Sequence, residues 1–427
     1  MRHGLEVRPD RSGAEQPAPR IATLDVLRGA AVMGILAMNV VGFGLPFQAY
    51  MNPAALGPPD AVDTASWSLS FVLFDGKMRG LFSFLFGASA LLVIERAEAA
   101  GLKGASVHFR RMAWLLFFGL VHFYLIWSGD ILISYALIGM AAFMFRSRPP
   151  EKLVALGLAF LSIQLLLIGA MSASVYMLAQ AAAAPGAEAD LVRQWLAMER
   201  EFGILSPAQT AQEIALYQAS YPEIVRHRLV EDGAQPLTGL LLFGWETLAY
   251  MLFGMAGLKS GFLTGDWKDR TYRRVAWVGF GIGIPAYAAL AWAYAASGFD
   301  TALTFALVMA ATTPLRPPMI AATAALVILL ARRAGPLHDR IAATGRVAFS
   351  NYLGTSILMT VLFYGYGLGL FGTLGRAELW LVVIATWALM LAWSTPWLDR
   401  FEYGPLEWLW RSLARWQVQP LRKSQPA

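Results

Sequence analysis

The chain contains no cysteine among its 427 residues, which excludes disulfide bonds, thiolate metal ligands and cysteine nucleophiles. It also carries few charges: Asp, Glu, Lys and Arg make up 15% of it, whereas a soluble protein carries about a quarter. Neither a phosphate-binding loop nor a dinucleotide-binding glycine motif is present. The shortage of charge argues against the roughly three soluble domains that the length alone would favour.

Long apolar runs take the place of the missing charges, because 57% of the residues are hydrophobic. Runs of this length are typical of membrane-spanning helices, so we expect an all-α polytopic membrane protein with about ten transmembrane helices. Pro314, Pro317 and Pro318 interrupt the eighth run, which predicts either a short outer helix followed by a span or one kinked helix. The runs are 21–44, 69–94, 111–128, 130–146, 152–181, 237–262, 274–297, 302–331, 346–369 and 376–396.

The distribution of positive charge predicts the orientation of these helices. Lys and Arg collect in the N-terminal tail and in the segments near 96–111, 146–152, 259–274, 332–340 and 400–423. With about ten helices all six segments lie on one side, which is the cytoplasm by the positive-inside rule. Both termini are then cytoplasmic, in an inner-membrane protein. The net charge of +6 follows from this topology and needs no nucleic-acid partner.

The runs divide the chain into five parts. Residues 1–20 are polar and lack the features of a secretory signal, so we expect a disordered cytoplasmic tail. Segments 21–182 and 237–398 hold five predicted helices each, and 183–236 forms a large external amphipathic loop. That loop is either a solvated cap or a lid over an outer site. Residues 399–427 form a cytoplasmic amphipathic tail, which includes an aromatic segment around Glu407.

Charges inside a span are costly, so each requires a partner or a function. An inner group begins with Asp25 and Arg28, which are spaced i,i+3 and share one face of the first helix. They form either a simple ion pair at headgroup level or part of a site. The other members of this group are Asn39, Arg346, Asn351 and Tyr352.

An outer group contains His122, which is the one histidine of five that falls inside a predicted span. It is either a structural histidine bonded to Asp130 or Glu246, or a general base that one of these carboxylates orients. The charges at the mouth of the second span, with a tryptophan from the sixth, complete the group: Asp75, Lys77, Arg79 and Trp245.

Two further features carry less weight. One buried histidine and scattered carboxylates show no close ligand spacing, so we expect no metal site. Gly365, Gly367 and Gly369 alternate near the end of the ninth run, where we expect close helix packing.

Taken together, these motifs resemble the YeiB-like bacterial membrane proteins, a large family of unknown function. The resemblance begins at Arg20 to Gly29, continues to Asn39, and covers nearly all of the chain after residue 20. The other matching segments are Lys77 to Gly87, Gly119 to Tyr135, Gly254 to Ala256, Gly345 to Leu353 and Gly404 to Trp408.

The opening Asp25-x-x-Arg28-Gly29 also looks like that of two groups of membrane acyltransferases. One contains heparan-α-glucosaminide N-acetyltransferase, and the other contains the type-three enzymes that acylate surface glycans. The resemblance implies transfer of an acyl group from cytoplasmic acyl-coenzyme A (acyl-CoA) to a sugar across the membrane, and it raises the expectation of a homodimer. The type-three enzymes commonly have a histidine where this chain has Asn39, so His122 is the alternative candidate for that role.

The resulting hypothesis is a transmembrane acyltransferase with acyl-CoA as co-substrate. Arg28 and Arg346 bind the phosphates, with Asp25, Asn39, Asn351 and Tyr352 nearby. His122 deprotonates a sugar or another small hydroxyl or amine acceptor, and Asp130 or Glu246 orients its ring. Asp75, Lys77, Arg79 and Trp245 serve the acceptor, with Lys77 or Arg79 stabilising the oxyanion. Direct transfer and an acyl-histidine intermediate both remain open.

Two other classes of function compete with this hypothesis. A transporter of a small solute would explain charges at both mouths and the proline-broken eighth helix, although no clear inverted repeat supports it. A scaffold without chemistry would leave the charges inside the spans unexplained. Dependence on coenzyme A (CoA) separates the enzyme from the transporter.

Overall fold

The computed structural model describes residues 21–333 and 335–423, so the predicted tail at 1–20 lies outside the described residues. Within these ranges the chain forms helices and turns, with one isolated bridge between Phe401 and Arg422 and no strands. The helices of the bundle are α1 (Ala22–Gly44), α3 (Ala61–Leu73), α4 (Lys77–Ala99), α5 (Gly104–Val121), α6 (Leu132–Ala142), α7 (Pro150–Ala183), α11 (Gln235–Lys259), α12 (Asp269–Ala296), α14 (Arg316–Ala331), α16 (Ala348–Phe363) and α17 (Arg376–Arg400). The remaining α-helices are α2 (Gln48–Met51), α8 (Ala189–Phe202), α9 (Pro207–Tyr217), α10 (Tyr221–Val230), α13 (Thr301–Thr304), α15 (Pro336–Arg346) and α18 (Pro405–Arg415).

The helices confirm an all-α membrane protein. Seven helical segments of the described chain are long and apolar enough to cross a bilayer, and four shorter helices of 10–17 residues are also apolar. Two of the shorter helices, Thr301–Ala310 and Arg316–Ala331, occupy the eighth predicted run. Of the two alternatives for that run, two separate helices rather than one kinked helix therefore form. The total of about ten crossings stays a prediction.

Two predicted runs differ from the helices that form. The run 69–94 spans a break, because α3 ends at Leu73 and Gly76 adopts a left-handed φ of 66° before α4 begins. The run 346–369 joins α16 to a turn, since α16 ends at Phe363. Gly365, Gly367 and Gly369 therefore lie beyond the helix, and helix packing is the wrong explanation for them. A Cβ atom on Gly365 would overlap the backbone of Gln218, so that glycine permits contact with the outer loop.

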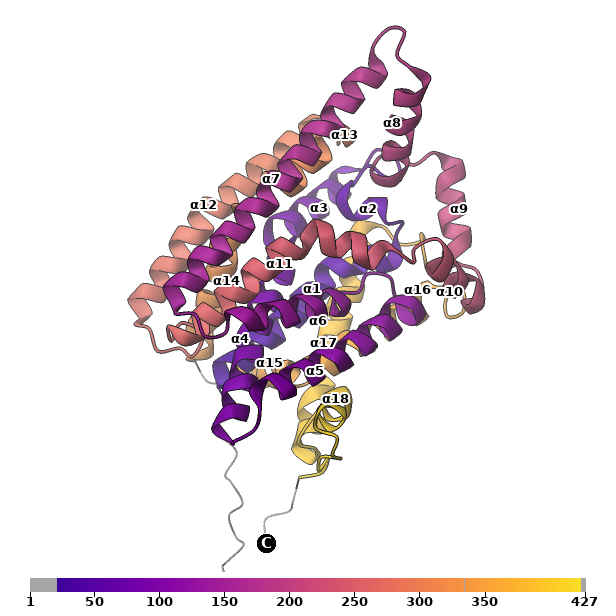
Figure 1. The fold of residues 1–427 in the computed structure, drawn as a ribbon. Coiled ribbons are helices and arrows are strands. Elements are labelled where there is room, and N and C mark those ends of the chain that lie inside the picture. Colours follow the sequence, from indigo (N-terminus) through magenta and orange to yellow (C-terminus); the bar gives the residue numbers. More distant parts are fainter. Residues whose placement is uncertain (1–20, 334, 424–427) are drawn as a thin grey trace, which may run out of the picture.

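The bundle has two ends, which are marked by contacts between distant loops (Figure 1). At the end that carries α18, Lys259 donates hydrogen bonds to the carbonyl oxygens of Arg146 and Arg148 at 2.6 and 2.9 Å. At the end that carries α8, Gln48 donates to the carbonyl oxygen of Arg200 at 3.1 Å. Gly365 there donates its N–H to the carbonyl oxygen of Tyr217 at 2.9 Å.

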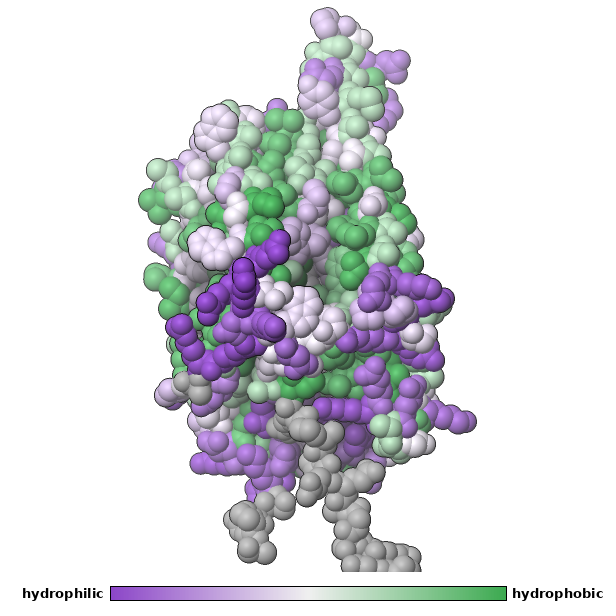
Figure 2. Space-filling model, turned by 90° about the vertical axis from the view of Figure 1, so that its left-hand side faces the viewer, coloured by the Kyte–Doolittle hydropathy of each residue, from purple (hydrophilic) through white to green (hydrophobic). Residues whose placement is uncertain are grey.

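Hydrophobic side chains cover much of the outer surface, as a membrane-embedded bundle requires. Figure 2 shows a broad apolar area over the upper part of one face, while hydrophilic side chains gather from mid-height downward. On α12, Trp277 and Trp292 are 80% and 74% exposed. Exposed tryptophans near both ends of a span are typical of the membrane interfaces.

Glycines allow α4 and α11 to cross with their backbones in contact. A Cβ atom on Gly87 would overlap the carbonyl of Met251, and one on Gly254 would overlap the carbonyl of Phe84. The contact is reciprocal, since each glycine meets the residue three positions before the other. This close crossing brings Arg79, two turns earlier in α4, against Glu246 of α11.

The predicted external loop 183–236 forms three helices, α8, α9 and α10, which we call the cap. Trp195 and Phe202 of α8 pack against Phe305 and its neighbours. Tyr217, at the end of α9, stacks on Phe371 with ring centroids 4.5 Å apart. The cap therefore lies across the α8 end of the bundle, over the elements that surround the candidate site.

Candidate functional site

A cavity of about 320 Å³ lies between α1, α3, α4, α6 and α11, in the half of the bundle nearest the cap. Aromatic and methionine side chains form a large part of its wall, including Tyr50, Trp67, Phe74 and Met78. Five charged residues from five separate segments also line it: Asp75, Arg79, Asp130, Arg316 and Arg376. A mostly apolar cavity with a few converging polar groups is the usual form of a small-molecule site.

Interruptions in the helices place these charges. Asp75 follows the end of α3. A Cβ atom on the next residue, Gly76, would overlap the side chain of Arg316, so a glycine at this position lets Arg316 pack against the turn. Arg316 begins α14 directly after the turn 311–315. Pro317 and Pro318 occupy the first turn of α14, where the missing N–H groups have no helical partner anyway.

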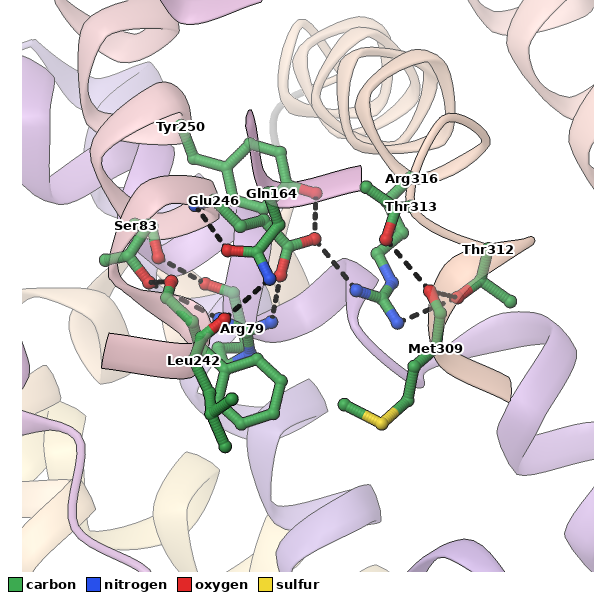
Figure 3. Close-up of polar contacts among 12 residues, drawn as sticks. Arg79, Ser83, Gln164, Leu242, Glu246, Tyr250, Met309, Thr312, Thr313 and Arg316 are labelled. Atoms are coloured by element: carbon green, nitrogen blue, oxygen red, sulfur yellow. Dashed lines mark hydrogen bonds and ion pairs between the residues drawn. The ribbon is translucent and has the colours of Figure 1, made fainter. Parts of the chain in front are cut away.

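Glu246 forms the centre of a buried ion network beside the cavity (Figure 3). Its carboxylate accepts hydrogen bonds from Arg79 at 2.5 Å and from Arg316 at 2.8 Å. The hydroxyl of Tyr250 donates to the same carboxylate at 2.6 Å. Glu246 is fully buried, whereas the Arg79 side chain keeps 29% exposure and lines the cavity. One negative charge thus holds two guanidinium groups in place.

Gln164 of α7 completes this network from the other side. Its amide nitrogen donates to the carbonyl oxygen of Leu242 at 2.6 Å, and its amide oxygen accepts from the N–H of Glu246 at 3.2 Å. Arg316 also donates to the hydroxyl of Thr312 at 2.8 Å. The network therefore joins α4, α7, α11 and α14.

His122 and Asp130 form a buried pair at a second edge of the cavity. His122 begins a π-helical turn, His122–Ile126, that ends α5, and its Nδ1 lies 2.8 Å from Asp130. The second carboxylate oxygen of Asp130 accepts from the N–H of Ile133 at 2.8 Å and so caps α6. Both side chains are at most 1% exposed. Since an ionised carboxylate only accepts hydrogen bonds, Nδ1 carries the proton when the ring is neutral.

The other ring nitrogen of His122 lies inside the bundle, and His122 itself is not among the residues that line the cavity. Nε2 is buried and has no hydrogen-bond partner. The ring lies beside Tyr352, with centroids 5.3 Å apart, and the Tyr352 hydroxyl is also buried without a partner. The sequence left open whether Asp130 or Glu246 contacts His122, and in the structure it is Asp130.

Three other predicted acceptor residues have different surroundings. Lys77 points away from the cavity: its Nζ donates to the carbonyl oxygen of Phe71 at 2.9 Å and lies over the Tyr287 ring. Trp245 stacks on Phe160 and is 38% exposed, outside the cavity lining. Asp75 lines the cavity.

The residues predicted to form one inner group do not all contact one another in the structure. Asp25 accepts a hydrogen bond from Arg28 at 2.9 Å. Arg346 ends α15, and its neighbour Gly345 lies so close to α1 that a Cβ atom would overlap the carbonyl of Asp25. Asn351 instead bonds to Thr344, Ser394 and Trp393 and stabilises the packing of α16 on α17.

A narrow space separates these two regions. A small cavity of about 10 Å³ is lined by residues of α1, α16 and α17, including Val32, Asn39 and Tyr352. Asn39 and Ile35 line both this space and the larger cavity. The lining of this space begins at Val32, about one turn after Arg28, and most of it is apolar.

Sequence reasoning missed Arg316, Arg376 and Gln164. Arg316 lies within the eighth predicted run, where any charge is costly, and that position alone could have identified it. Arg376 is 7% exposed and donates to the carbonyl oxygens of Ala49 and Asn52. Among residues 21–333 and 335–423, no group of three or more His, Asp or Glu is placed to hold a metal ion.

The fold and the buried charges define a helical membrane protein with a polar cavity inside its bundle. Within that class the chain belongs to the YeiB-like family: residues 258–417 match the family described as "Protein of unknown function (DUF418)". It is 33% identical over 417 residues to the uncharacterized protein YeiB of Escherichia coli, covering 92% of this chain and 96% of that protein. It is 30% identical over 424 residues to the uncharacterized protein YxaH of Bacillus subtilis, covering 95% and 96%. The resemblance to this family is confirmed, and it assigns no reaction.

Proposed function

We propose that the protein is a transmembrane acyltransferase of the bacterial inner membrane, with about ten crossings and both termini in the cytoplasm. It takes an acyl group from cytoplasmic acyl-CoA and transfers it to a sugar or another small hydroxyl or amine compound from the opposite side. The α18 end of the bundle faces the cytoplasm, and the cap faces outward.

The buried His122–Asp130 pair is the observation that carries this proposal. A histidine oriented through Nδ1 by a carboxylate, with Nε2 unoccupied, has the arrangement of a general base. Asp130 lines the outer cavity, so an acceptor bound there lies at the edge of the pair. An orphaned buried nitrogen is uncommon in a purely structural histidine.

The donor approaches from the other end. Arg28 binds the phosphates of acyl-CoA, with Arg346 at the end of α15. From Arg28 to Asn39 the chain rises 11 residues along α1, which is about 16 Å. The thin arm of the donor passes along Val32 and Asn39, where the space of about 10 Å³ widens on binding, and brings the thioester to the edge of the outer cavity.

The transfer step breaks the thioester C–S bond and forms an acyl bond to the acceptor oxygen or nitrogen. His122 accepts the acceptor's proton and delivers it to the departing thiolate. Arg79, which lines the cavity, stabilises the oxyanion. Lys77 is the weaker candidate, because its ammonium group is bonded to a backbone carbonyl away from the cavity. Attack by the acceptor or by His122 itself fits this geometry equally well.

Binding of acyl-CoA tests the proposal. Acetyl-CoA and longer acyl-CoA esters are titrated into the purified protein in nanodiscs, with wild type and Arg28→Ala compared and Arg110→Ala as the control. We expect micromolar binding by wild type and by the control, and at least a tenfold loss in Arg28→Ala. Failure of the wild type to bind any chain length would overturn the proposal.

A transporter is the second candidate, and interrupted helices around the cavity favour it. The chain leaves helical geometry at Gly76, between Trp127 and Ile131, and between Ala311 and Leu315, all next to cavity-lining charges. Broken helices beside a central polar site are typical of secondary transporters. Absence of acyl-CoA binding, together with solute uptake by proteoliposomes, would favour this function.

A further inference from the structure

Arginines from three distant parts of the chain gather where α18 docks against α5. Arg111 of α5 lies over the Trp410 ring of α18, the helix that also carries Arg411 and Arg415, and Arg28 of α1 is near enough to act on Arg111 electrostatically. Arg28 and Arg415 lie near opposite ends of the sequence, so only the fold brings these residues together. We call these four residues the arginine cluster.

The docking of α18 is built from specific contacts. Trp410 donates through its indole N–H to the carbonyl oxygen of Arg111 at 2.9 Å. The Arg111 guanidinium lies over the Trp410 ring, 4.2 Å from its centroid. Glu407 accepts the backbone N–H groups of Phe349 and Ser350 at 2.7 and 3.0 Å, which caps α16. The cluster therefore lies on a fixed surface.

Two arginines of the cluster have no carboxylate partner in the described part of the chain. Asp25 is bonded to Arg28, and the Glu407 carboxylate is occupied by the start of α16. Within residues 21–333 and 335–423, neither Arg111 nor Arg415 has a carboxylate within 4.0 Å. The Nε of Arg28 is buried without a hydrogen-bond partner. Like charges held this close are stabilised by an anion with several oxygen acceptors.

We infer that the arginine cluster binds phosphate groups and that α18 forms half of this site. Guanidinium groups match phosphate through paired donors and a permanent charge. This inference rests on the proposed function, under which the phosphates belong to the nucleotide end of acyl-CoA. The position fits that end, because Val32, which lines the narrow space, lies one turn after Arg28 on α1.

The test uses the full chain in phosphatidylcholine nanodiscs, with CoA, dephospho-CoA and pantetheine as probes. The variants are Arg415→Gln, which changes an exposed residue, and Arg111→Gln/Arg415→Gln. Arg110→Gln is the matched control, since Arg110 is adjacent to Arg111 but bonds within its own turn, to Ser106. Thermal unfolding of each variant checks that it folds.

We expect the double variant to bind CoA at least tenfold more weakly, with a smaller salt dependence, while its affinity for pantetheine is unchanged. Arg415→Gln alone gives a smaller loss in the same direction, and the control gives none. CoA affinity that is equal in wild type and both variants would overturn the inference and leave the acyltransferase proposal intact. Absence of CoA binding by wild type would overturn both.

Lipid headgroups are the other source of phosphate on this side of the membrane. A second series therefore uses nanodiscs that contain phosphatidylglycerol. If the variants lose stabilisation by phosphatidylglycerol but keep full CoA affinity, the cluster serves the lipid and the nucleotide assignment is wrong.

Discussion

Glu246 is a single buried carboxylate that neutralises two arginines from different helices. Arg79 and Arg316 both donate to it, and neither has another carboxylate within 4.0 Å in the described part of the chain. Removing one partner of a buried ion pair is far more costly than replacing the whole pair, because the remaining charge stays buried. The energetic effect of Glu246 is therefore tied to its partners.

We expect Glu246→Gln to lower the free energy of unfolding by about 3–5 kcal/mol, since two guanidinium groups would face each other without a counter-charge. Thermal unfolding in detergent measures this change, with the exposed Glu223→Gln as the control. The double variant Glu246→Gln/Arg316→Gln should recover part of the loss. A double variant less stable than the sum of the two single changes would contradict the shared-charge explanation.

Variants of His122 and Asp130 are expected to lower the rate of acyl transfer without affecting folding. His122→Gln should lower acyl transfer by about 10²–10⁴-fold and leave acyl-CoA affinity and the unfolding temperature close to wild type. Asp130→Asn should give a smaller loss, because it weakens the orientation of the ring only. Released CoA thiol is followed with Ellman's reagent, to which this cysteine-free chain contributes no signal.

A second buried histidine provides the control for these variants. His108 bonds to the carbonyl oxygen of Gly139 at 2.9 Å and does not line the cavity. His108→Gln keeps a donor for that bond and should retain turnover. Equal rates in His122→Gln and wild type, with amino sugars, glycerol and bacterial lipid extract as acceptors, would remove His122 from the mechanism.

At the scale of elements, α18 acts on the bundle through one carboxylate. Burial raises the pKa of the Glu407 carboxyl above its usual value, although hydrogen bonds from Ser350 and Phe349 oppose this shift. A carboxyl with a raised folded-state pKa contributes stability below its unfolded pKa and loses that contribution as the pH rises through the folded value. Docking of α18 on α16 should therefore weaken as the pH rises above about 4, the usual range of a glutamate.

Limited proteolysis of α18 across the acidic range measures this dependence. Glu407→Gln keeps an oxygen acceptor for the backbone N–H groups of α16 and cannot ionise. It should remove the pH dependence while α18 remains docked. Identical pH profiles for the variant and wild type would show that Glu407 does not control the docking.

At the scale of the whole molecule, the proposed topology predicts that the two ends of the bundle are accessible from opposite sides of the membrane. The lack of native cysteine allows single-cysteine labelling without background. Exposed positions at the cap end, Asp190→Cys and Asp300→Cys, should react with a membrane-impermeant maleimide in spheroplasts. Lys103→Cys and Lys268→Cys, exposed at the α18 end, should react only after permeabilisation. Labelling of both pairs from outside would contradict the proposed ten-crossing topology.

The sequence by itself determined the class of protein and the position of most helices. Hydrophobic length is a local property, because a span needs about 20 apolar residues in a row whatever lies beside it. The same reasoning identified His122 and Glu246, since a charged or titratable side chain inside an apolar run is conspicuous without any structure. The broken eighth run followed from its prolines, which cannot continue a helical hydrogen-bond ladder.

Only the tertiary structure decided which of these groups meet. Asp130, rather than Glu246, contacts His122, while Glu246 instead bonds to Arg79 and Arg316. Partners of this kind depend on the rotation and crossing of helices, and here glycines such as Gly254 set the crossing through backbone contact. Spacing along one helix specifies a face of that helix, but the opposing face comes from a part of the chain far away in sequence.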